Sequence, residues 1–384
     1  MIQRDIGSLL EQYSREFRAV MVVGPRQSGK TTLVRETFPD KPYVSLENPD
    51  ERLLAQGDPR AFLNRFPEGA VLDEVQRVPE LFNYLQEIID NSDRDGLFIL
   101  TGSNNILLQE GVSQSLAGRL GVLELMPLSY REVKDHGAGD ATLNELVLKG
   151  GYPEIFHKGR KPELWYASYL RTYVERDVRQ IKNVENSMLF TKFLKLCAGR
   201  IGQQLNVSSL SNECGIDVRT VQSWLSILEM TYVVKLLPPY YKNFNKRVVK
   251  SPKLFFYDTG LACTLLSIRK AGELSLSHFR GALVENYVIM ECIKNNMNFD
   301  RGEVFYYWRE NHGIEIDLMI DSASGFLPVE IKSAETFHPE FKKNILKIMD
   351  LSGVSEGRVL YDGAQEFKGS DGVEVMNWRS FVVG

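Results

Sequence analysis

Short runs of apolar residues, each ending in polar or turn-forming residues, organise the first third of the chain. They span residues 19–23, 70–72 and 97–100. Uninterrupted apolar runs of this length are typical of buried parallel strands. The pattern therefore predicts strand–helix units that form a parallel sheet covered on both faces, in an α/β domain over residues 1–126.

The pattern becomes mostly helical after this domain. Apolar residues recur near helical spacing over 127–185, and residues 186–260 contain shorter helices. One of these helices is expected to end at Gly215, and Asp217 then caps the next. Two helices joined by a glycine turn form a helix-turn-helix, and two strand-like runs within 232–257 complete a winged-helix layout.

The last segment, residues 261–384, contains a hairpin pattern. Polar and apolar residues alternate over 314–320, turn-forming residues follow, and 326–333 reads as the return strand. A hairpin centred on that turn places Asp317 close to Glu330 across the ladder. Lys332, two positions after Glu330, lies on the same face.

Composition restricts the class of protein. A length of 384 residues exceeds what one core normally serves, so we expect two to four domains. No apolar run approaches transmembrane length and no signal-peptide block opens the chain, which predicts a soluble cytoplasmic protein without a membrane partner. The scattered cysteines are expected to be reduced core thiols. They are Cys197, Cys214, Cys263 and Cys292.

The first apolar run leads directly into a phosphate-binding motif. The sequence after it fits G-x-x-x-x-G-K-[ST], with a strand before and the start of a helix after. Glycines let backbone N–H groups curve around phosphate, Lys30 reaches the β- and γ-phosphates, and the Thr31 hydroxyl binds Mg²⁺. The nucleotide-binding residues predicted here are Gly24, Pro25, Arg26, Gln27, Ser28, Gly29, Lys30, Thr31 and Thr32.

The other two runs supply candidate groups for hydrolysis. Asp73 and Glu74 end the second run, where Asp73 is expected to hold Mg²⁺ and Glu74 to activate the attacking water. Residues 101–104 end the third run, either as a sensor of the γ-phosphate or as an ordinary polar loop. No guanine-reading Asn-Lys-x-Asp element occurs, so ATP is the expected nucleotide.

These motifs resemble the prokaryotic AAA+ -type ATPases of the AAA 14 group. The resemblance continues through Leu72-Asp73-Glu74-Val75-Gln76, Leu100-Thr101-Gly102-Ser103, Ser115-Leu116-Ala117-Gly118-Arg119, Glu124-Leu125-Met126-Pro127-Leu128-Ser129, Gly150-Gly151-Tyr152-Pro153-Glu154 and Tyr173-Val174-Glu175-Arg176-Asp177. It implies an ATPase core over 1–126, a helical lid over 127–185, a winged-helix module over 186–260 and, over 261–384, a domain related to PD-(D/E)XK nucleases.

Two arginines follow from the ATPase interpretation. Arg119 is the candidate arginine finger toward a neighbouring subunit, which requires a homo-oligomer, and Arg176 is the candidate phosphate sensor of the lid. The alternative for either residue is an ordinary surface salt bridge, which contributes little.

The predicted wing is rich in aromatic and basic residues. This composition suits a nucleic-acid backbone, most simply DNA, although winged helices also bind proteins and a basic hairpin is often only solvated. The wing residues are Tyr240, Tyr241, Lys242, Phe244, Lys246, Arg247, Lys250 and Lys253.

The hairpin carries a candidate nuclease site. Asp317 and Glu330 are expected to bind Mg²⁺, and Lys332 to position or activate water. The nuclease resemblance adds Glu285, on a preceding helix, as a further metal ligand. A cross-strand charge pair on a solvent face explains the same spacing. The function favoured by the sequence is an ATP-dependent protein that acts on nucleic acid and has a candidate metal-dependent nuclease site. The alternative is a nucleotide-driven switch whose C-terminal domains bind a partner protein or DNA without cleavage.

Overall fold

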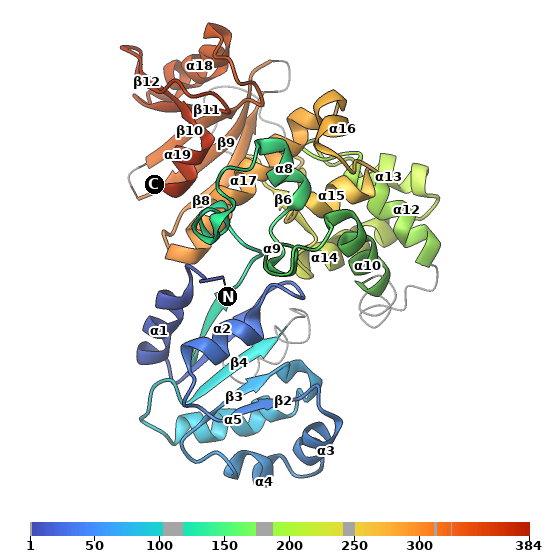
Figure 1. The fold of residues 1–384 in the computed structure, drawn as a ribbon, viewed down its shortest axis with the longest axis vertical. Coiled ribbons are helices and arrows are strands. Elements are labelled where there is room, and N and C mark those ends of the chain that lie inside the picture. Colours follow the sequence, from blue (N-terminus) through green and yellow to red (C-terminus); the bar gives the residue numbers. More distant parts are fainter. Residues whose placement is uncertain (1, 103–117, 174–186, 241–249, 311–312, 324) are drawn as a thin grey trace. The chain divides into compact units, whose positions relative to one another are not determined.

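The computed structural model describes residues 2–102, 118–173, 187–240, 250–310, 313–323 and 325–384 (Figure 1). The chain folds into two compact units. The first comprises Met1–Leu128 with two short later segments, Met230–Tyr232 and Met297–Asp300, and the second comprises the rest. We describe each unit by itself.

The first unit is built on a parallel sheet of five strands in the order β2-β3-β4-β1-β5. Its strands are β1 (Ala19–Val23), β2 (Tyr43–Ser45), β3 (Ala70–Asp73), β4 (Phe98–Gly102) and β5 (Leu120–Glu124). Its helices are α1 (Gly7–Glu16), α2 (Lys30–Thr37), α3 (Pro49–Gly57), α4 (Pro59–Asn64), η1 (Val75–Arg77) and α5 (Leu81–Asp90). All of β1 is buried, as a central strand of such a sheet requires.

Alternate side chains of β1 enter two different cores. Val20 and Val22 pack with residues of α1 and α2, while Met21 belongs to the cluster formed by α3, α4 and α5. The prediction of a parallel sheet with helices on both faces is therefore confirmed. The prediction missed β2 and β5, because β2 has only three residues and β5 carries the exposed Val122, so neither forms a long apolar run.

The second unit begins with helices. They are α7 (Tyr130–Val133), η3 (Lys134–Ala138), α8 (Leu143–Lys149), α9 (Pro153–His157), α10 (Pro162–Tyr173), α12 (Ser187–Ala198), α13 (Val207–Cys214) and α14 (Val218–Met230). Two antiparallel strands, β6 (Val234–Leu237) and β7 (Lys253–Phe256), follow. The helices α15 (Thr259–Leu265), α16 (Ala271–Leu276) and α17 (Arg280–Phe299) come next.

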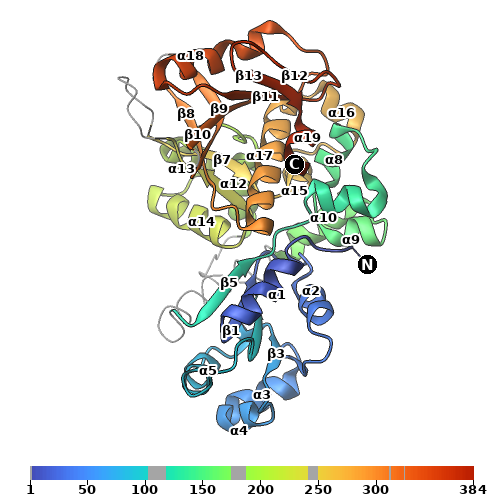
Figure 2. The same cartoon turned by 90° about the vertical axis from the view of Figure 1, so that its left-hand side faces the viewer.

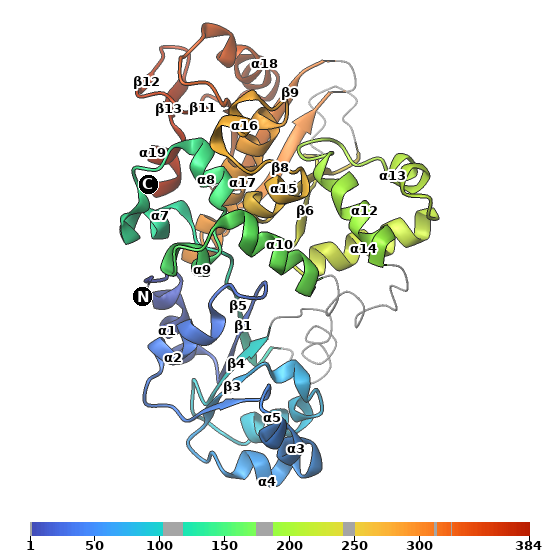
Figure 3. The same cartoon turned by 45° about the vertical axis from the view of Figure 1, so that its right-hand side comes forward.

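The local signals around Gly215 and Asp217 are confirmed. Gly215 ends α13 with a φ of 78°, a left-handed conformation that glycine adopts without steric cost. The Asp217 carboxylate accepts a hydrogen bond of 2.9 Å from the backbone N–H of Thr220, which caps α14. Within the described parts of residues 187–256, three helices are thus followed by a two-stranded sheet (Figure 3).

The chain ends in a mixed sheet of order β12-β13-β11-β10-β9-β8 (Figure 2). Its strands are β8 (Val304–Arg309), β9 (Glu315–Ser322), β10 (Gly325–Ile331), β11 (Gly357–Tyr361), β12 (Phe367–Lys368) and β13 (Val373–Asn377). Its helices are η5 (Pro339–Lys342), α18 (Lys343–Ser352) and α19 (Trp378–Val383). Buried residues of α18 share a core cluster with the strands.

The predicted hairpin is present, with a correction to its turn. Strand β9 continues to Ser322, which pairs with Gly325, so the turn is shorter than expected. The register runs to Val329 opposite Leu318, which brings Asp317 next to the end of β10. The predicted alternation is present at the start of β9, where Glu315 and Asp317 are partly exposed between buried residues. Further along the hairpin Met319 and Glu330 are buried, so both faces are covered there.

The helices expected to form a nucleotide lid are bonded within the second unit. The buried Asp258 accepts hydrogen bonds from the Gly151 N–H (2.7 Å) and the Tyr166 hydroxyl (2.6 Å). Thr259 donates to the Val147 carbonyl at 2.7 Å, which adds α8 to the same contact.

Among the described helices, none combines the length and apolar character needed to cross a membrane.

Candidate functional site

The phosphate-loop sequence lies at the carboxyl end of β1 and has the backbone that the motif requires. Gly24 has a φ of 148°, and a Cβ atom there would lie 2.2 Å from the Leu125 carbonyl oxygen, so only glycine fits. Gly29 has a φ of 96° directly before α2, and Gln27 has a φ of 60°. Such positive φ values curve the loop around the N-terminus of α2, where backbone N–H groups favour an anion.

Lys30 is buried in this loop, and backbone carbonyls are its hydrogen-bond partners among the described residues. Its ammonium donates to the carbonyl oxygens of Gly24 (3.1 Å) and Pro25 (2.8 Å). Burial lowers the pKa of Lys30 to about 8, and the nearby charges of Glu74 and Asp73 only partly oppose this effect. The geometry leaves a desolvated cation that an anionic ligand would stabilise.

Asp73, at the carboxyl end of β3, accepts hydrogen bonds from three hydroxyl groups. Thr31 donates at 3.0 Å to Oδ1, and Tyr43 donates at 2.7 Å to Oδ2. Thr101, at the end of β4, donates to Oδ1 as well. Residues from α2, β2 and β4 therefore fix the orientation of the Asp73 carboxylate. This indicates that the function of Asp73 depends on where its two oxygens point.

Glu74 adopts a left-handed backbone conformation with a φ of 57°, which is uncommon for a residue with a side chain. Its N–H donates to the Thr101 hydroxyl at 3.1 Å, and its carboxylate accepts a hydrogen bond from Gln76. Strained residues of this kind cluster at functional sites, where the surrounding contacts hold them. Glu74 therefore lies beside Asp73 at the same edge of the sheet.

The residues present fit a nucleotide with a bound Mg²⁺. Ser28 is fully buried inside the loop, and its hydroxyl oxygen has no hydrogen-bond partner among the described residues. Thr31 and Asp73 supply a hydroxyl and a carboxylate within 3.0 Å of each other. Mg²⁺ is commonly held by one or two carboxylates together with substrate phosphates, so this pair is a sufficient protein contribution.

Family comparisons agree with this geometry. Residues 16–134 match the model of an AAA domain. The first unit contains a P-loop ATPase domain of the AAA type. After this ATPase domain, residues 140–272 match one domain of unknown function (DUF8612) and residues 280–381 match another (DUF4143).

Similar proteins span most of the chain. An uncharacterized protein of Mycobacterium tuberculosis is 29% identical over 376 residues, which cover 97% of this chain and 82% of that protein. An uncharacterized protein of Methanocaldococcus jannaschii is 22% identical over 78% of this chain and 71% of its own length. The solved Walker-type ATPase of Pyrococcus abyssi aligns with 69% of this chain and 96% of its own, at 16% identity and a TM-score of 0.47.

The structure separates Arg119 from the phosphate loop of its own ATPase domain. Arg119 precedes Leu120, which pairs with Ala19 at the far end of β1, roughly 13 Å along the strand from the loop. Its guanidinium forms an ion pair with Asp90. Arg176, Ser103 and Asn104 lie outside the described residues.

The second unit brings together the residues predicted for the nuclease site. The Asp317 carboxylate accepts a hydrogen bond of 2.8 Å from the Ile331 N–H. The Lys332 ammonium lies 2.6 Å from Glu330 and 3.8 Å from Asp317. Burial raises the pKa of Glu330, the charge of Asp317 raises it further, and Lys332 opposes the shift.

The predicted metal site is not formed by these carboxylates. Within the part of the chain that the structure describes, no group of three or more His, Cys, Asp or Glu side chains could hold a metal ion. Lysines lie against two of these acids: Glu285 lies 2.9 Å from Lys253, and Glu330 lies 2.6 Å from Lys332, the lysine that the nuclease motif itself includes. Among the described residues, these carboxylates therefore do not converge on one point as the Mg²⁺ site of the nuclease resemblance requires.

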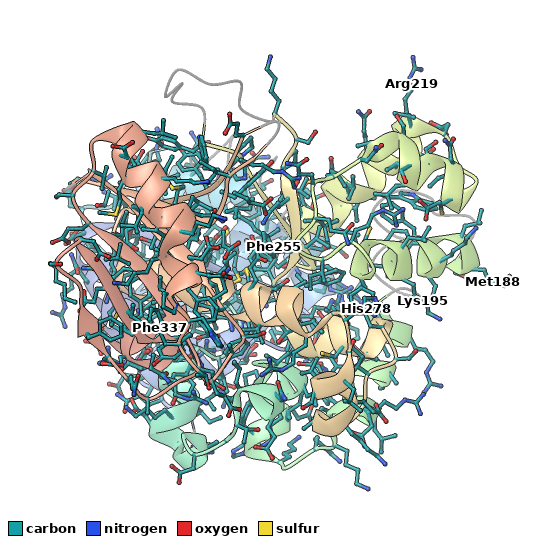
Figure 4. The ribbon with its side chains drawn as sticks, turned by 90° about the horizontal axis from the view of Figure 1, so that it is seen from above. Met188, Lys195, Arg219, Phe255, His278 and Phe337 are labelled. Atoms are coloured by element: carbon teal, nitrogen blue, oxygen red, sulfur yellow. The ribbon has the colours of Figure 1, made fainter. Side chains whose placement is uncertain are left out.

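The structure also corrects part of the predicted nucleic-acid surface. Tyr240 and Lys253 are buried, so neither offers a surface to a nucleic acid. Lys250 is exposed, and residues 241–249 lie outside the described part of the chain. A different exposed group is present on α14, where Arg219 extends outward from the start of the helix (Figure 4).

Two residues in these sites were missed or misassigned from the sequence. Tyr43 lies on a strand too short to recognise, so nothing in the sequence linked its hydroxyl to Asp73. Lys253 was assigned to the basic wing, although it follows Pro252 and begins the apolar run Lys253–Phe256. That apolar run was the available signal that the lysine starts a buried strand.

Proposed function

We propose that this protein binds ATP with Mg²⁺ and hydrolyses it. The observation that carries the proposal is Lys30, a buried ammonium that donates only to neutral carbonyls among its described hydrogen bonds, beside the oriented carboxylate of Asp73. A triphosphate supplies the negative charge that this arrangement requires. The loop amides and Lys30 would bind the phosphates, and Thr31 with Asp73 would hold Mg²⁺, which would neutralise charge on the phosphates.

Glu74 is the proposed water-activating residue. It adjoins Asp73, and its backbone is fixed by Thr101. The carboxylate that now accepts from Gln76 would accept a proton of the attacking water instead. Gln76 then has the role of holding Glu74 before the water is bound. Arg119, if it contributes, acts on the nucleotide of a neighbouring subunit, because it lies at the far end of its own sheet.

For the second unit we propose a winged-helix module that contacts nucleic acid, most simply DNA. The exposed residues Arg219, Gln222 and Ser226 recur along α14 at positions that share one face of the helix. Arginine and glutamine side chains can donate hydrogen bonds to phosphates and base edges, whereas the Ser226 hydroxyl already donates to the Gln222 carbonyl at 3.0 Å. The acidic neighbours Glu213 and Asp217 are occupied, the first by Arg200 and the second as the helix cap.

For the C-terminal domain the lysine pairs favour binding without cleavage. A domain of the PD-(D/E)XK type, which the arrangement of Asp317, Glu330 and Lys332 resembles, cuts with the help of a divalent ion. Lys332 belongs to that arrangement, but the ammonium of Lys253 does not, and it lies 2.9 Å from Glu285, one of the acids that would hold this ion. We therefore favour a nucleotide-driven switch that binds nucleic acid and leaves it intact.

The deciding experiment combines turnover and cleavage. Wild type is incubated with labelled single- and double-stranded DNA and RNA in Mg²⁺ or Mn²⁺, with and without ATP, beside Lys30→Ala and Lys332→Ala. We expect ATP hydrolysis that Lys30→Ala removes, and intact nucleic acid throughout. Cleavage that Lys332→Ala abolishes would instead establish a nuclease, and absence of ATP hydrolysis would overturn the ATPase proposal.

Binding is tested separately through its salt dependence. Arg219→Ala is expected to weaken DNA binding severalfold and to lower the slope of log affinity against log salt by about one. Lys347→Ala, which removes an exposed cation from α18, is the matched control and leaves both quantities unchanged. Equal effects of the two substitutions would show that α14 is not part of the DNA-binding surface.

A further inference from the structure

Three cations of the same chain form ion pairs with the four carboxylates of an acidic cluster in the second unit. Its carboxylates come from α17, β9 and the end of β10: Glu285, Glu315, Asp317 and Glu330. Its cations come from β7, β8 and the residue after β10: Lys253, Arg309 and Lys332. The ion pairs among them range from 2.5 to 3.8 Å. Charge compensation is therefore built into the fold at this point.

Lys253 is the central cation of this cluster. Only 1% of the residue is exposed, and its ammonium lies 2.9 Å from Glu285 and 2.5 Å from Glu315. It also lies 5.5 Å from the centre of the Tyr307 ring. Burial by itself lowers the pKa of Lys253, but the charges of Glu285, Asp317 and Glu315 outweigh burial and raise it. The ammonium is a permanent positive charge among the acids.

The backbone around Lys253 is held in place by several hydrogen bonds. The side chain of Asn286, the neighbour of Glu285 on α17, bonds both the N–H (2.6 Å) and the carbonyl (2.7 Å) of Phe256. On the other side, the Leu254 N–H donates to the Gln203 carbonyl at 3.0 Å. Lys253 therefore reaches the acids from a strand that is fixed to the same helix, and not from a mobile loop.

We infer that Lys253 is an internal counter-ion that takes the place of a divalent metal ion and keeps the C-terminal acidic cluster closed to metal. Among the described acids of the cluster, the buried oxygen left without a hydrogen-bond partner is Glu330 Oε2. The ammonium of Lys253 lies 2.9 Å from Glu285 and 2.5 Å from Glu315, so it pairs with carboxylate oxygens that a divalent ion would need. Lys253 lies within residues 140–272, which match one domain of unknown function, and the four acids lie within residues 280–381, which match another. One domain therefore supplies the cation to the other.

This inference deepens the proposed non-cutting role and rests on it. Its test uses Mn²⁺ alone, with neither nucleotide nor nucleic acid. The inference and the proposed non-cutting role can therefore fail separately. Nuclease activity of wild type would overturn the role, whereas the Mn²⁺ titration addresses only the counter-ion. Asp73→Asn is introduced into every protein to remove the carboxylate of the ATPase site.

The comparison is between Lys253→Met and a matched substitution in the same unit. Lys294→Met also removes a buried lysine from a glutamate, because Lys294 lies 2.8 Å from Glu291 on α17. Mn²⁺ binding is followed by electron paramagnetic resonance of the free ion, and thermal unfolding is measured with and without Mn²⁺. Lys253→Met is expected to gain one Mn²⁺ site and to be stabilised by Mn²⁺. Adding Asp317→Asn removes both effects, and Lys294→Met shows neither.

Two results would overturn the inference. The first is that the protein that retains Lys253 binds Mn²⁺ and that this binding is lost when Asp317→Asn is added. The second is a folded Lys253→Met protein that gains no Mn²⁺ site. Lys253→Gln, which keeps a hydrogen-bond donor for the glutamates, is the second variant if the methionine variant does not fold. It is expected to gain the same site, and its failure to do so while folded also overturns the inference.

Discussion

The ATPase site and the acidic cluster both place buried lysines among carboxylates, yet their charges are arranged in opposite ways. In the first, Lys30 donates to backbone carbonyls and Asp73 accepts from hydroxyl groups, so neither charge is paired with the other. In the second, Lys253 bonds directly to Glu285 and Glu315. The pKa of Lys30 is lowered, chiefly by burial, whereas that of Lys253 is raised because its carboxylate neighbours outweigh burial.

This difference separates a site that awaits a ligand from one that is already complete. A buried cation without a counter-ion is costly unless a ligand supplies the missing charge. A buried cation with two carboxylates has its counter-ions within the protein. The residue types alone do not distinguish these cases, because both sites contain Lys, Asp and Glu. The partner of each lysine does.

The largest expected effect comes from the water-activating residue. Glu74→Gln keeps the shape of the side chain but removes its ability to accept a proton, so ATP hydrolysis is expected to fall roughly 10²- to 10⁴-fold. ATP binding, measured by calorimetry, is expected to persist, because Lys30 and Thr31 are intact. Glu80→Gln, an exposed glutamate of the same domain, is the control. Unchanged turnover in Glu74→Gln would show that another group activates the water.

Arg119→Ala is expected to lower hydrolysis on the order of 10³-fold while leaving ATP binding unchanged. Arg119 lies far from the phosphate loop of its own domain, so the proposed effect on hydrolysis is one on a neighbouring subunit. Mixing Arg119→Ala with Lys30→Ala is then expected to restore part of the activity. Arg94→Ala, which breaks an exposed pair with Glu68, is the control. No recovery in the mixture would argue against a trans role.

Tyr43→Phe tests how strongly Asp73 depends on its orientation. The variant removes the hydroxyl that donates to Asp73 at 2.7 Å and leaves the ring in place. Removing a group that orients a metal ligand typically costs about 10- to 100-fold in metal affinity, so the Mg²⁺ concentration for half-maximal hydrolysis should rise about tenfold. ATP affinity without Mg²⁺ stays constant. Tyr84→Phe in the same domain is the control, and an equal rise there would contradict the assignment.

The smallest effect concerns pH. Because burial lowers the pKa of Lys30 to about 8, the free protein loses this charge above pH 8, and phosphate binding must restore it. ATP binding should therefore take up almost no proton at pH 7 and approach one proton at pH 9. Calorimetry in buffers of different ionisation enthalpy measures this uptake. Lys30→Arg, which stays charged, removes the difference, and equal uptake by wild type at both pH values would contradict the pKa shift.

Local features of both sites follow from the sequence to a large extent. The phosphate loop, the Asp73–Glu74 strand end and the proximity of Asp317 to Glu330 all depend on spacing within a short segment, as does the Gly215 turn outside these sites. The contacts of Gly150, in contrast, depend on residues far away in the chain. A Cβ atom there would lie 2.3 Å from Asp258, a residue more than one hundred positions later. Sequence periodicity carries no record of such long-range partners.

The same limit applies at the acidic cluster. Asp317, Glu330 and Lys332 were predicted from one hairpin, but the residue that changes the chemistry, Lys253, comes from another sheet. The short strand that carries Tyr43 shows the same effect in the ATPase domain. Where a site is completed by a residue far away in the chain, the motif predicts the local geometry and the partner decides the function.

Counting the Mn²⁺ ions bound by wild type at saturating ATP tests this contrast most directly. We predict one Mn²⁺ per chain, lost in Lys30→Ala together with the nucleotide and unaffected by Asp317→Asn. A second Mn²⁺ that Asp317→Asn removes would show that the acidic cluster is open to metal. That result would contradict the account, because the lysines of the second unit would then not have completed the site.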